Sequence, residues 1–209
     1  MIDGEMDAKA FVAKFAPASA LEKLKTLEEA LRAENQLQNL VSSASLRNIW
    51  QRHFADSAQL MAFVPRETQS CMDLGSGAGF PGLILAILAP EVAVTLVEVR
   101  GRRIEWLERM RNDLGLHNCK VEGCRLEQVS TRPVDLITAR AFAPLEKLLK
   151  LSARFSTSRT RWLLPKGRSA ASEVKGLPDN LRAMFHVEQS LTSADAGIII
   201  GTGKVEARQ

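Results

Sequence analysis

The spacing of apolar and polar residues divides the chain into two parts. From Ala8 to Leu40 apolar residues recur at helical spacing with polar residues between them, which predicts an N-terminal helical region. A second helix is predicted from Leu46 to Phe63. The serines of "SSAS" can cap its first turn, and Pro65 ends it.

Beyond Ser70 short apolar runs alternate with amphipathic stretches, from "CMDLG" and "FPGLILAILAP" to "TRWLLPKG". Such alternation predicts β-α-β units, which form a parallel sheet with helices on both faces. The strand-like runs are apolar throughout, as expected where both faces of a sheet are covered. The last two runs, "AMFHVEQSL" and "AGIIIGTG", predict an antiparallel closing hairpin.

Composition narrows the class of protein. No uncharged apolar stretch reaches about 18 residues and no secretory signal is visible, so we expect a cytoplasmic protein without a membrane partner. The three cysteines lack CxxC spacing, which disfavours disulfides and a zinc site, and no metal is expected.

Charge is uneven along the chain, although the net charge is only +4. The stretch from Arg140 to Lys175 carries nine Lys or Arg and two Glu. This excess of positive charge indicates a polyanionic partner. A basic, solvated helix face is the alternative interpretation.

The stretch "MDLGSGAGFPG" places a glycine-rich turn directly after the first predicted strand. Such a turn lets a ligand lie on backbone amides at the start of the next helix. A dinucleotide fingerprint G-x-G-x-x-G fails from Gly75, because its third position is Phe80. The fingerprint matches at Gly77, Gly79 and Gly82, but two extra residues would then separate the strand from the first of these glycines.

The pattern Asp-x-Gly-x-Gly-x-Gly fits better, with Asp73, Gly75, Gly77 and Gly79. A carboxylate that faces the site suits a cationic ligand rather than a pyrophosphate. Glu98 ends the second strand, where a carboxylate can accept both ribose hydroxyls of a nucleoside. Together these residues indicate S-adenosyl-L-methionine as the cofactor, because it joins an adenosine to a sulfonium and carries no phosphate.

Several motifs in one order carry a family resemblance: "NLVSS...IWQRHFADSAQL", "DLGSGAGFPGL", "CRLEQV", "ITARAFAPL" and "LLPKG". With them the chain resembles the RsmG (GidB) family of bacterial 16S rRNA guanine-N7 methyltransferases. The resemblance implies an α/β, Rossmann-like, class I S-adenosylmethionine-dependent fold with a seven-stranded, mostly parallel sheet. This domain is expected at residues 67–209, with residues 1–66 as a helical region packed on it.

The resemblance also implies an activity and a partner. The expected reaction transfers a methyl group from S-adenosyl-L-methionine to N7 of guanine 527, near the decoding region of the small ribosomal subunit. The expected partner is 16S rRNA, in the subunit or its assembly intermediate, and not DNA. We expect a monomer.

The resemblance assigns two groups of site residues, and the clustered positive charge of the chain indicates a third group. The cofactor lies at Gly75 and Phe80, at Leu126 and Glu127 beside the adenine, and at Arg140. The substrate side carries His53, Asp56 and Lys166. Phosphates of the RNA are expected at Arg102, Arg103, Arg140, Lys166 and Arg168. The chain departs from the family at Val41, where Thr is usual, and at Arg102 or Arg103, where one Lys is usual.

Guanine N7 has a lone pair and no proton, so its methylation needs no general base. The protein must mainly align the reactants, and positioning of this kind lowers a barrier by roughly 7 to 11 kcal/mol. Arg140, Lys166, His53 and Asp56 are the positioning candidates. We interpret His53 and Asp56, three residues apart on a predicted helix, as a pair that shapes the pocket.

Two other classes of protein remain. A nicotinamide-dependent oxidoreductase is disfavoured because the chain has no tyrosine to donate a proton. A non-catalytic RNA-binding protein is disfavoured by the complete glycine turn and by Glu98. Trp50, Trp106 and Trp162 could stack on RNA bases, but each lies in an apolar period, which favours core packing.

Overall fold

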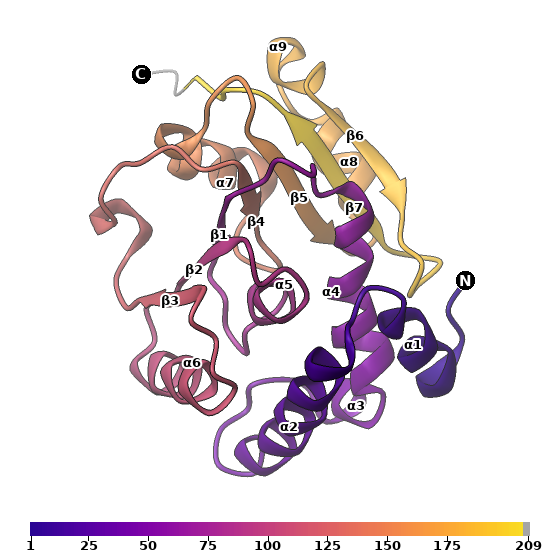
Figure 1. Cartoon of the computed structure of the whole chain (residues 1–209). Coiled ribbons are helices and arrows are strands. Elements are labelled where there is room, and N and C mark those ends of the chain that lie inside the picture. The colour runs from indigo at the N-terminus through magenta and orange to yellow at the C-terminus, as the bar shows by residue number, and fades with distance from the viewer. Residues whose placement is uncertain (207–209) are drawn as a thin grey trace.

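The computed structural model describes residues 1–206 and is built on a seven-stranded sheet in the order β3-β2-β1-β4-β5-β7-β6 (Figure 1). β1 to β5 pair in parallel, whereas β7 runs antiparallel to both β5 and β6. The predicted parallel sheet and closing hairpin are confirmed. The strands are β1 (Ser70–Leu74), β2 (Ala93–Val97), β3 (Cys119–Glu122), β4 (Leu136–Thr138), β5 (Arg161–Lys166), β6 (Phe185–Gln189) and β7 (Gly197–Thr202).

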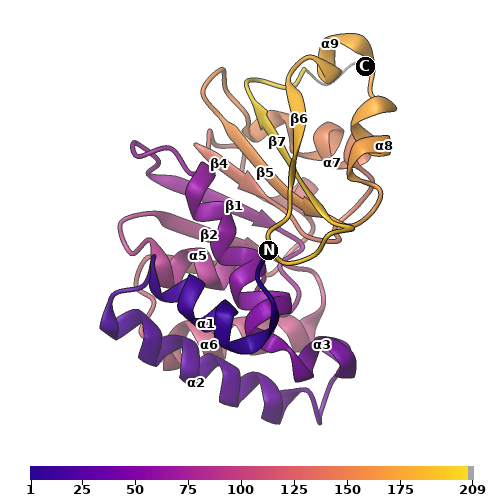
Figure 2. The same ribbon diagram turned by 90° about the vertical axis from the view of Figure 1, so that its right-hand side faces the viewer.

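Helices cover both faces of the sheet (Figure 2). The first group lies before and between the early strands: α1 (Gly4–Ala13), α2 (Ala18–Glu34), α3 (Ser43–Arg47), η1 (Trp50–Ala55), α4 (Asp56–Ala58), η2 (Gln59–Phe63), α5 (Gly82–Leu88) and α6 (Gly101–Asp113). The second group follows β3: η3 (Leu126–Gln128), α7 (Leu145–Ser152), η4 (Ala153–Phe155), α8 (Ala170–Lys175) and α9 (Asp179–Arg182). The sequence pattern did not predict α8 and α9.

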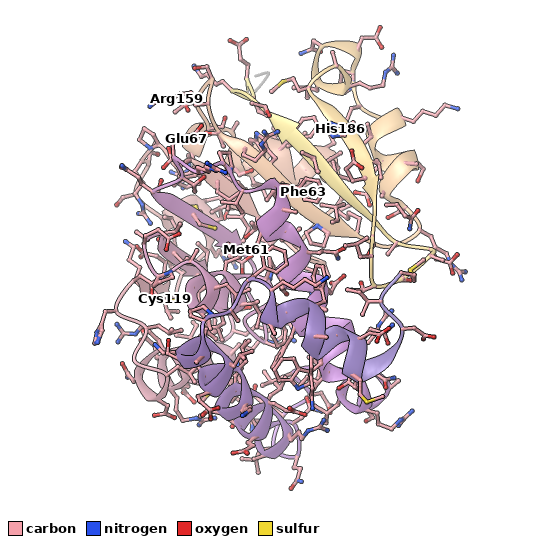
Figure 3. All side chains as sticks on the ribbon, turned by 45° about the vertical axis from the view of Figure 1, so that its right-hand side comes forward. Met61, Phe63, Glu67, Cys119, Arg159 and His186 are labelled. Atoms are coloured by element: carbon pink, nitrogen blue, oxygen red, sulfur yellow. The ribbon has the colours of Figure 1, made fainter. Side chains whose placement is uncertain are left out.

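Side chains alternate between two hydrophobic cores, one on each face. Leu163 of β5 and Ile198 of β7 face the core with α2, α5 and α6, whereas Trp162, Leu164 and Ile199 face the core with α7 and α8. This period of two is the geometry of a strand buried on both faces. Cys119 lies on β3 at one edge of the sheet and His186 on β6 at the other (Figure 3).

The N-terminal helices share the first of these cores. Leu24, Leu27 and Leu31 of α2 are fully buried, and α2 and α4 both contact α5. The helical region therefore packs on the face that also carries α5 and α6. Its predicted boundary at residue 67 stays a prediction.

The single helix predicted from Leu46 to Phe63 is wrong, because the structure has four short helical segments there. Ser42 caps the first, as predicted, since its hydroxyl accepts from the Ser45 backbone N–H. The chain leaves helical geometry at Asn48, where φ is −120° and ψ is 50°. The Glu5 carboxylate then accepts the backbone N–H groups of Trp50 and Gln51, at 3.2 and 2.9 Å. A contact with α1 thus starts a new π-helical turn, and local periodicity cannot predict such a contact.

Among residues 1–206, no helix combines the length and the apolar character that a membrane crossing requires.

Candidate active site

The glycine-rich turn follows β1 and leads into α5. Gly75, Gly77 and Gly79 adopt positive φ angles of +65°, +59° and +101°, a region that residues with a side chain rarely adopt. The Ser76 backbone N–H donates to the Val97 carbonyl at 3.0 Å and so fixes the turn against the end of β2. The turn therefore presents bare backbone at the carboxyl edge of the sheet.

Asp73 lies beneath this turn and is fully buried. Its Oδ1 accepts from Thr138 Oγ1 of β4 at 2.8 Å, and its Oδ2 has no hydrogen-bond partner among the described residues. Burial raises the pKa of Asp73 to about 6, although the hydrogen bond from Thr138 opposes the shift. The carboxylate thus lies between β1 and β4 rather than on the open side of the turn.

Glu98 joins the turn to the segment after β2. Its Oε2 accepts the Gly77 backbone N–H at 2.9 Å, and its Oε1 accepts those of Val99 and Arg100 at 2.8 and 3.0 Å. The side chain is 5% exposed. The structure therefore brings Glu98 and the glycine turn together, as the sequence predicted.

Arg140, at the end of β4, gathers the substrate-side candidates. Its Nη2 lies 3.0 Å from His53 Nδ1, and its Nη1 lies 3.3 Å from both Asp56 Oδ2 and the Arg52 carbonyl oxygen. His53 and Asp56 thus meet at Arg140, and the expected pairing between them is replaced by two contacts to one guanidinium. Asp56 Oδ1 also accepts from Thr192 Oγ1 at 2.8 Å.

The protonation of His53 follows from this contact. A guanidinium has no acceptor, so His53 Nδ1 must accept and the ring proton must sit on Nε2. Burial, with the positive charges of Arg140 and Arg52, lowers the pKa of His53 to about 3. The imidazole is therefore neutral at physiological pH, and its Nε2 is buried without a partner among the described residues.

Phe80 connects the glycine turn to this cluster. Its ring stacks on His53 with centroids 4.9 Å apart and an interplanar angle of 11°. The Arg140 guanidinium lies 5.1 Å from the centre of the same ring. Phe80, a predicted cofactor residue, thus contacts two predicted positioning residues.

Lys166, at the end of β5, is paired rather than free. Its Nζ donates to the Ala143 carbonyl at 2.8 Å and to Glu173 Oε2 of α8 at 2.9 Å. The same Oε2 accepts the Leu145 backbone N–H at 2.7 Å, and Oε1 accepts from Ser169 Oγ at 2.7 Å. Burial alone would raise the pKa of Glu173, but these hydrogen bonds outweigh burial and hold the pKa below its usual range. The sequence reasoning missed Glu173, whose only signal was its rarity as an acid in the basic stretch.

A cavity of about 860 Å³ joins these residues. Its lining includes these charged and titratable side chains: Arg52, His53, Asp56, Arg140, Lys166 and Glu173. It also includes these hydroxyl-bearing residues: Ser42, Ser45, Ser169, Ser190, Thr192 and Ser193. All four positioning candidates therefore lie on one cavity, whereas Asp73, Gly75, Glu98 and Leu126 lie outside its lining. Phe142 lines the cavity and also packs against Gly75.

The remaining candidates lie around this centre. Leu126 is buried in η3, between β3 and β4, and Glu127 beside it is exposed. Arg102 donates to the Leu37 carbonyl at 2.9 Å, so it links α6 to the N-terminal helices. Arg103 Nη1 lies 3.5 Å from the position that a Cβ would take on Gly77. Arg168 is 84% exposed and pairs with Asp195 at 2.7 Å. Roles in RNA binding stay predictions for these arginines.

The three tryptophans are core residues, as the sequence favoured. Trp50, Trp106 and Trp162 are at most 3% exposed. The indole N–H of Trp106 donates to the Ala78 carbonyl at 3.0 Å, so α6 supports the glycine turn from below. No RNA base can stack on side chains buried this deeply.

Solved structures share the fold of this chain at low sequence identity. In the complex of fibrillarin with Nop5p, one chain matches with a TM-score of 0.56 and 15% identity, over 73% of this chain and 84% of that chain. An rRNA methylase from Streptococcus thermophilus matches with a TM-score of 0.52 and 16% identity, over 70% of this chain and 93% of that chain. At these identities the likeness concerns the fold, that of class I methyltransferases.

Sequence relatives are much closer. A ribosomal RNA small subunit methyltransferase G from Erythrobacter litoralis is 55% identical over 206 residues, which cover 99% of this chain and all of the relative. A protein of the same name from Sphingopyxis alaskensis is 51% identical over 180 residues, or 86% of this chain and 77% of the relative. Residues 20–198 match the GidB family model, described as rRNA small subunit methyltransferase G. The predicted resemblance is confirmed, and the chain belongs to the rRNA small subunit methyltransferase G family.

Proposed function

We propose that this methyltransferase methylates N7 of a guanine in 16S rRNA, namely guanine 527. Membership of the family makes rRNA of the small subunit the substrate class. The choice of N7 is supported by one observation: His53, Asp56 and Lys166, which line the cavity, are all engaged by other side chains. We propose further that the protein acts as a monomer in the cytoplasm, on the subunit or its assembly intermediate.

None of the three titratable positioning candidates is arranged as a free base. His53 has a pKa of about 3 and its acceptor nitrogen is engaged by Arg140. Asp56 is held by Arg140 and Thr192, and Lys166 is paired with Glu173. A reaction that must remove a proton from its nucleophile would need such a base. Guanine N7 carries no proton, so methylation there agrees with this set of side chains.

S-Adenosyl-L-methionine is the methyl donor of this family of methyltransferases. When bound, it supplies an electrophilic methyl carbon on a positively charged sulfur. The residues present fit it: the positive-φ glycines leave bare backbone for close approach, and Glu98 stands at the end of β2 beside them. Asp73 Oδ2, which is buried without a hydrogen-bond partner among residues 1–206, adds negative potential beneath the turn.

We therefore assign the cofactor to one set of residues around the turn. Glu98 binds the ribose hydroxyls, and the backbone at Gly75 and Gly77 lies against the ligand. Leu126 and Glu127 stand beside the adenine. Asp73, Phe80 and Arg140 complete the set from the side of β4.

The cavity provides the substrate side. Its volume of about 860 Å³ lies within the range of about 300 to 1,000 Å³ that small-ligand sites occupy, which leaves room for one nucleotide. A guanine must leave its stack to enter such a cavity. Arg140 and Lys166 would meet its phosphates inside, and Arg102, Arg103 and Arg168 would meet those of flanking nucleotides.

The test is a base-resolved map of N7-methylguanine in 16S rRNA. Small subunits from a strain that lacks this gene are incubated with the purified protein and S-adenosyl-L-methionine, and N7-methylguanine is located by chemical cleavage and primer extension. One new modified guanine, at position 527, is the expected result. A methyl group on another atom or another guanine would refute the assignment. Free 16S rRNA in a parallel reaction distinguishes RNA from the assembled subunit as substrate.

A further inference from the structure

Phe142 covers Gly75, the first residue of the glycine turn. Its Cδ2 lies 2.6 Å from the position that a Cβ would take on Gly75, so the ring rests directly on the Gly75 backbone. The side chain is half-buried and also lines the cavity. Phe142 thus occupies the approach to the backbone assigned to the cofactor and touches the substrate side as well.

The segment that carries Phe142 is strained and needs support from outside. Ala141 has a φ of +54°, which costs about 1 to 3 kcal/mol in a residue with a Cβ. Such a conformation persists only where neighbouring groups hold it. The loop from Arg140 to Leu145 therefore takes its shape from the side chains that bind its two ends.

Both ends are bound by residues of the cavity. Before Ala141, the Arg140 guanidinium is held by His53 and Asp56. After Phe142, the Ala143 carbonyl accepts from Lys166, and the Leu145 N–H donates to Glu173. No hydrogen bond from Lys166 or Glu173 reaches the glycine turn, so within residues 1–206 they act on it through this loop.

The Lys166–Glu173 pair is well placed to hold the loop. The two side chains are only 10% and 20% exposed, so their 2.9 Å ion pair is partly shielded from solvent. Ser169 holds the second Glu173 oxygen and fixes the carboxylate on α8. An anion that reaches Lys166 from the cavity would compete with Glu173 for the ammonium and loosen the hold on Ala143.

We infer that Phe142 is a gate on the glycine turn and that Glu173, through Lys166, is a positioning residue that keeps it closed. Cofactor entry requires Phe142 to leave Gly75. RNA phosphate at Lys166 opens the gate, so RNA and cofactor favour each other's binding. This last step rests on the proposed function, whereas the gate itself does not.

The gate is tested by the affinity for S-adenosyl-L-methionine alone, measured by isothermal titration calorimetry. A gate closed in about nine molecules of ten weakens the apparent affinity about tenfold, so Phe142→Ala should tighten binding by about that factor. Glu173→Gln should tighten binding severalfold. In the Phe142→Ala background, Glu173→Gln should not tighten cofactor binding further, because the gate is then already absent. Phe142→Leu, a milder change, should fall between wild type and Phe142→Ala.

Structural readouts and a control complete this experiment. Hydrogen exchange of the backbone from Ala141 to Leu145 should be faster in Glu173→Gln than in wild type, without ligand. Glu22→Gln removes a solvent-exposed pair with Lys25 on α2 and should leave both measurements unchanged. Weaker or equal cofactor binding by both Phe142 variants would overturn the gate. An effect of Glu173→Gln that persists in the Phe142→Ala background would overturn the role of Glu173.

The RNA step has its own arm. Cofactor affinity is measured again with saturating, in vitro transcribed 16S rRNA. Wild type should approach the affinity of Phe142→Ala, and Phe142→Ala should not respond. If RNA leaves the wild-type affinity unchanged while Phe142→Ala alone tightens it, the gate stands and its opening by RNA is refuted. The binding of cofactor without RNA thus separates the gate from the choice of RNA substrate.

Discussion

Arg140 Nη2 donates to His53 Nδ1 across 3.0 Å and fixes both the tautomer and the charge of the imidazole. The two residues are 87 positions apart, one at the end of β4 and the other in η1. Their contact joins the N-terminal helices to the carboxyl edge of the sheet. The cavity wall is therefore made by the helical region and the sheet together.

Arg140→Lys should lower the rate of rRNA methylation about 100-fold, because misplacement of the substrate-side groups by about 1 Å has effects of this size. A lysine keeps the charge but lacks the fork that serves His53 and Asp56 at once. Single-turnover methyl transfer at saturating cofactor measures the change. Arg182→Lys, which alters a pair with Asp179 at the surface, is the matched control and should react at the wild-type rate. Equal rates for both variants would contradict the role of the fork.

Asp73→Asn should stabilise the free protein at neutral pH and lose this advantage in acid. Burial raises the pKa of Asp73 to about 6, above its ordinary value of 3.8. The stability that the protonated carboxyl contributes is therefore present below pH 3.8 and lost as pH rises through about 6. The shift corresponds to about 3 kcal/mol, since one pKa unit is about 1.4 kcal/mol. Urea unfolding of both proteins at pH 4 and pH 7.5 should show the difference in unfolding free energy growing with pH.

Sequence patterns predicted the sheet and the turn because both depend on local order. One local stretch of sequence contains both the strand that begins at Ser70 and the glycines that begin at Gly75. The predicted end of the second strand, β2, gave the position of Glu98. The contacts of the cavity arise between distant segments and carry no local signal. Glu173 holds the loop through the Leu145 backbone N–H, and Leu145 lies 28 positions earlier in the chain. Phe142 could be recognised as a covering residue only once β4 was seen beside β1.

Gly75→Val should abolish detectable cofactor binding. The position has a φ of +65°, and a Cβ there would meet Phe142 at 2.6 Å, so a valine displaces the ring and fills the approach to the turn. Gly115→Val provides the control, because Gly115 has a similar φ of +57° but open space around it. Both variants should lose free energy of unfolding from backbone strain, Gly75→Val more than Gly115→Val because it also displaces Phe142, and only Gly75→Val should lose the ligand. Titration calorimetry with thermal unfolding separates the two effects, and equal binding by both variants would argue against the assigned turn.

Glu98→Gln should weaken cofactor binding about 10- to 100-fold, as expected when a buried acceptor is lost at a cost of about 1 to 3 kcal/mol. The glutamine carbonyl can still accept from Val99 and Arg100, but its amide then faces the Gly77 N–H, which loses its acceptor. The turn would loosen at the point where the ribose is assigned. Glu105→Gln, exposed on α6, is the matched control. A loss of affinity for adenosine as well as for S-adenosyl-L-methionine would place the effect at the nucleoside. Unchanged affinity for both compounds would contradict a role of Glu98 in cofactor binding.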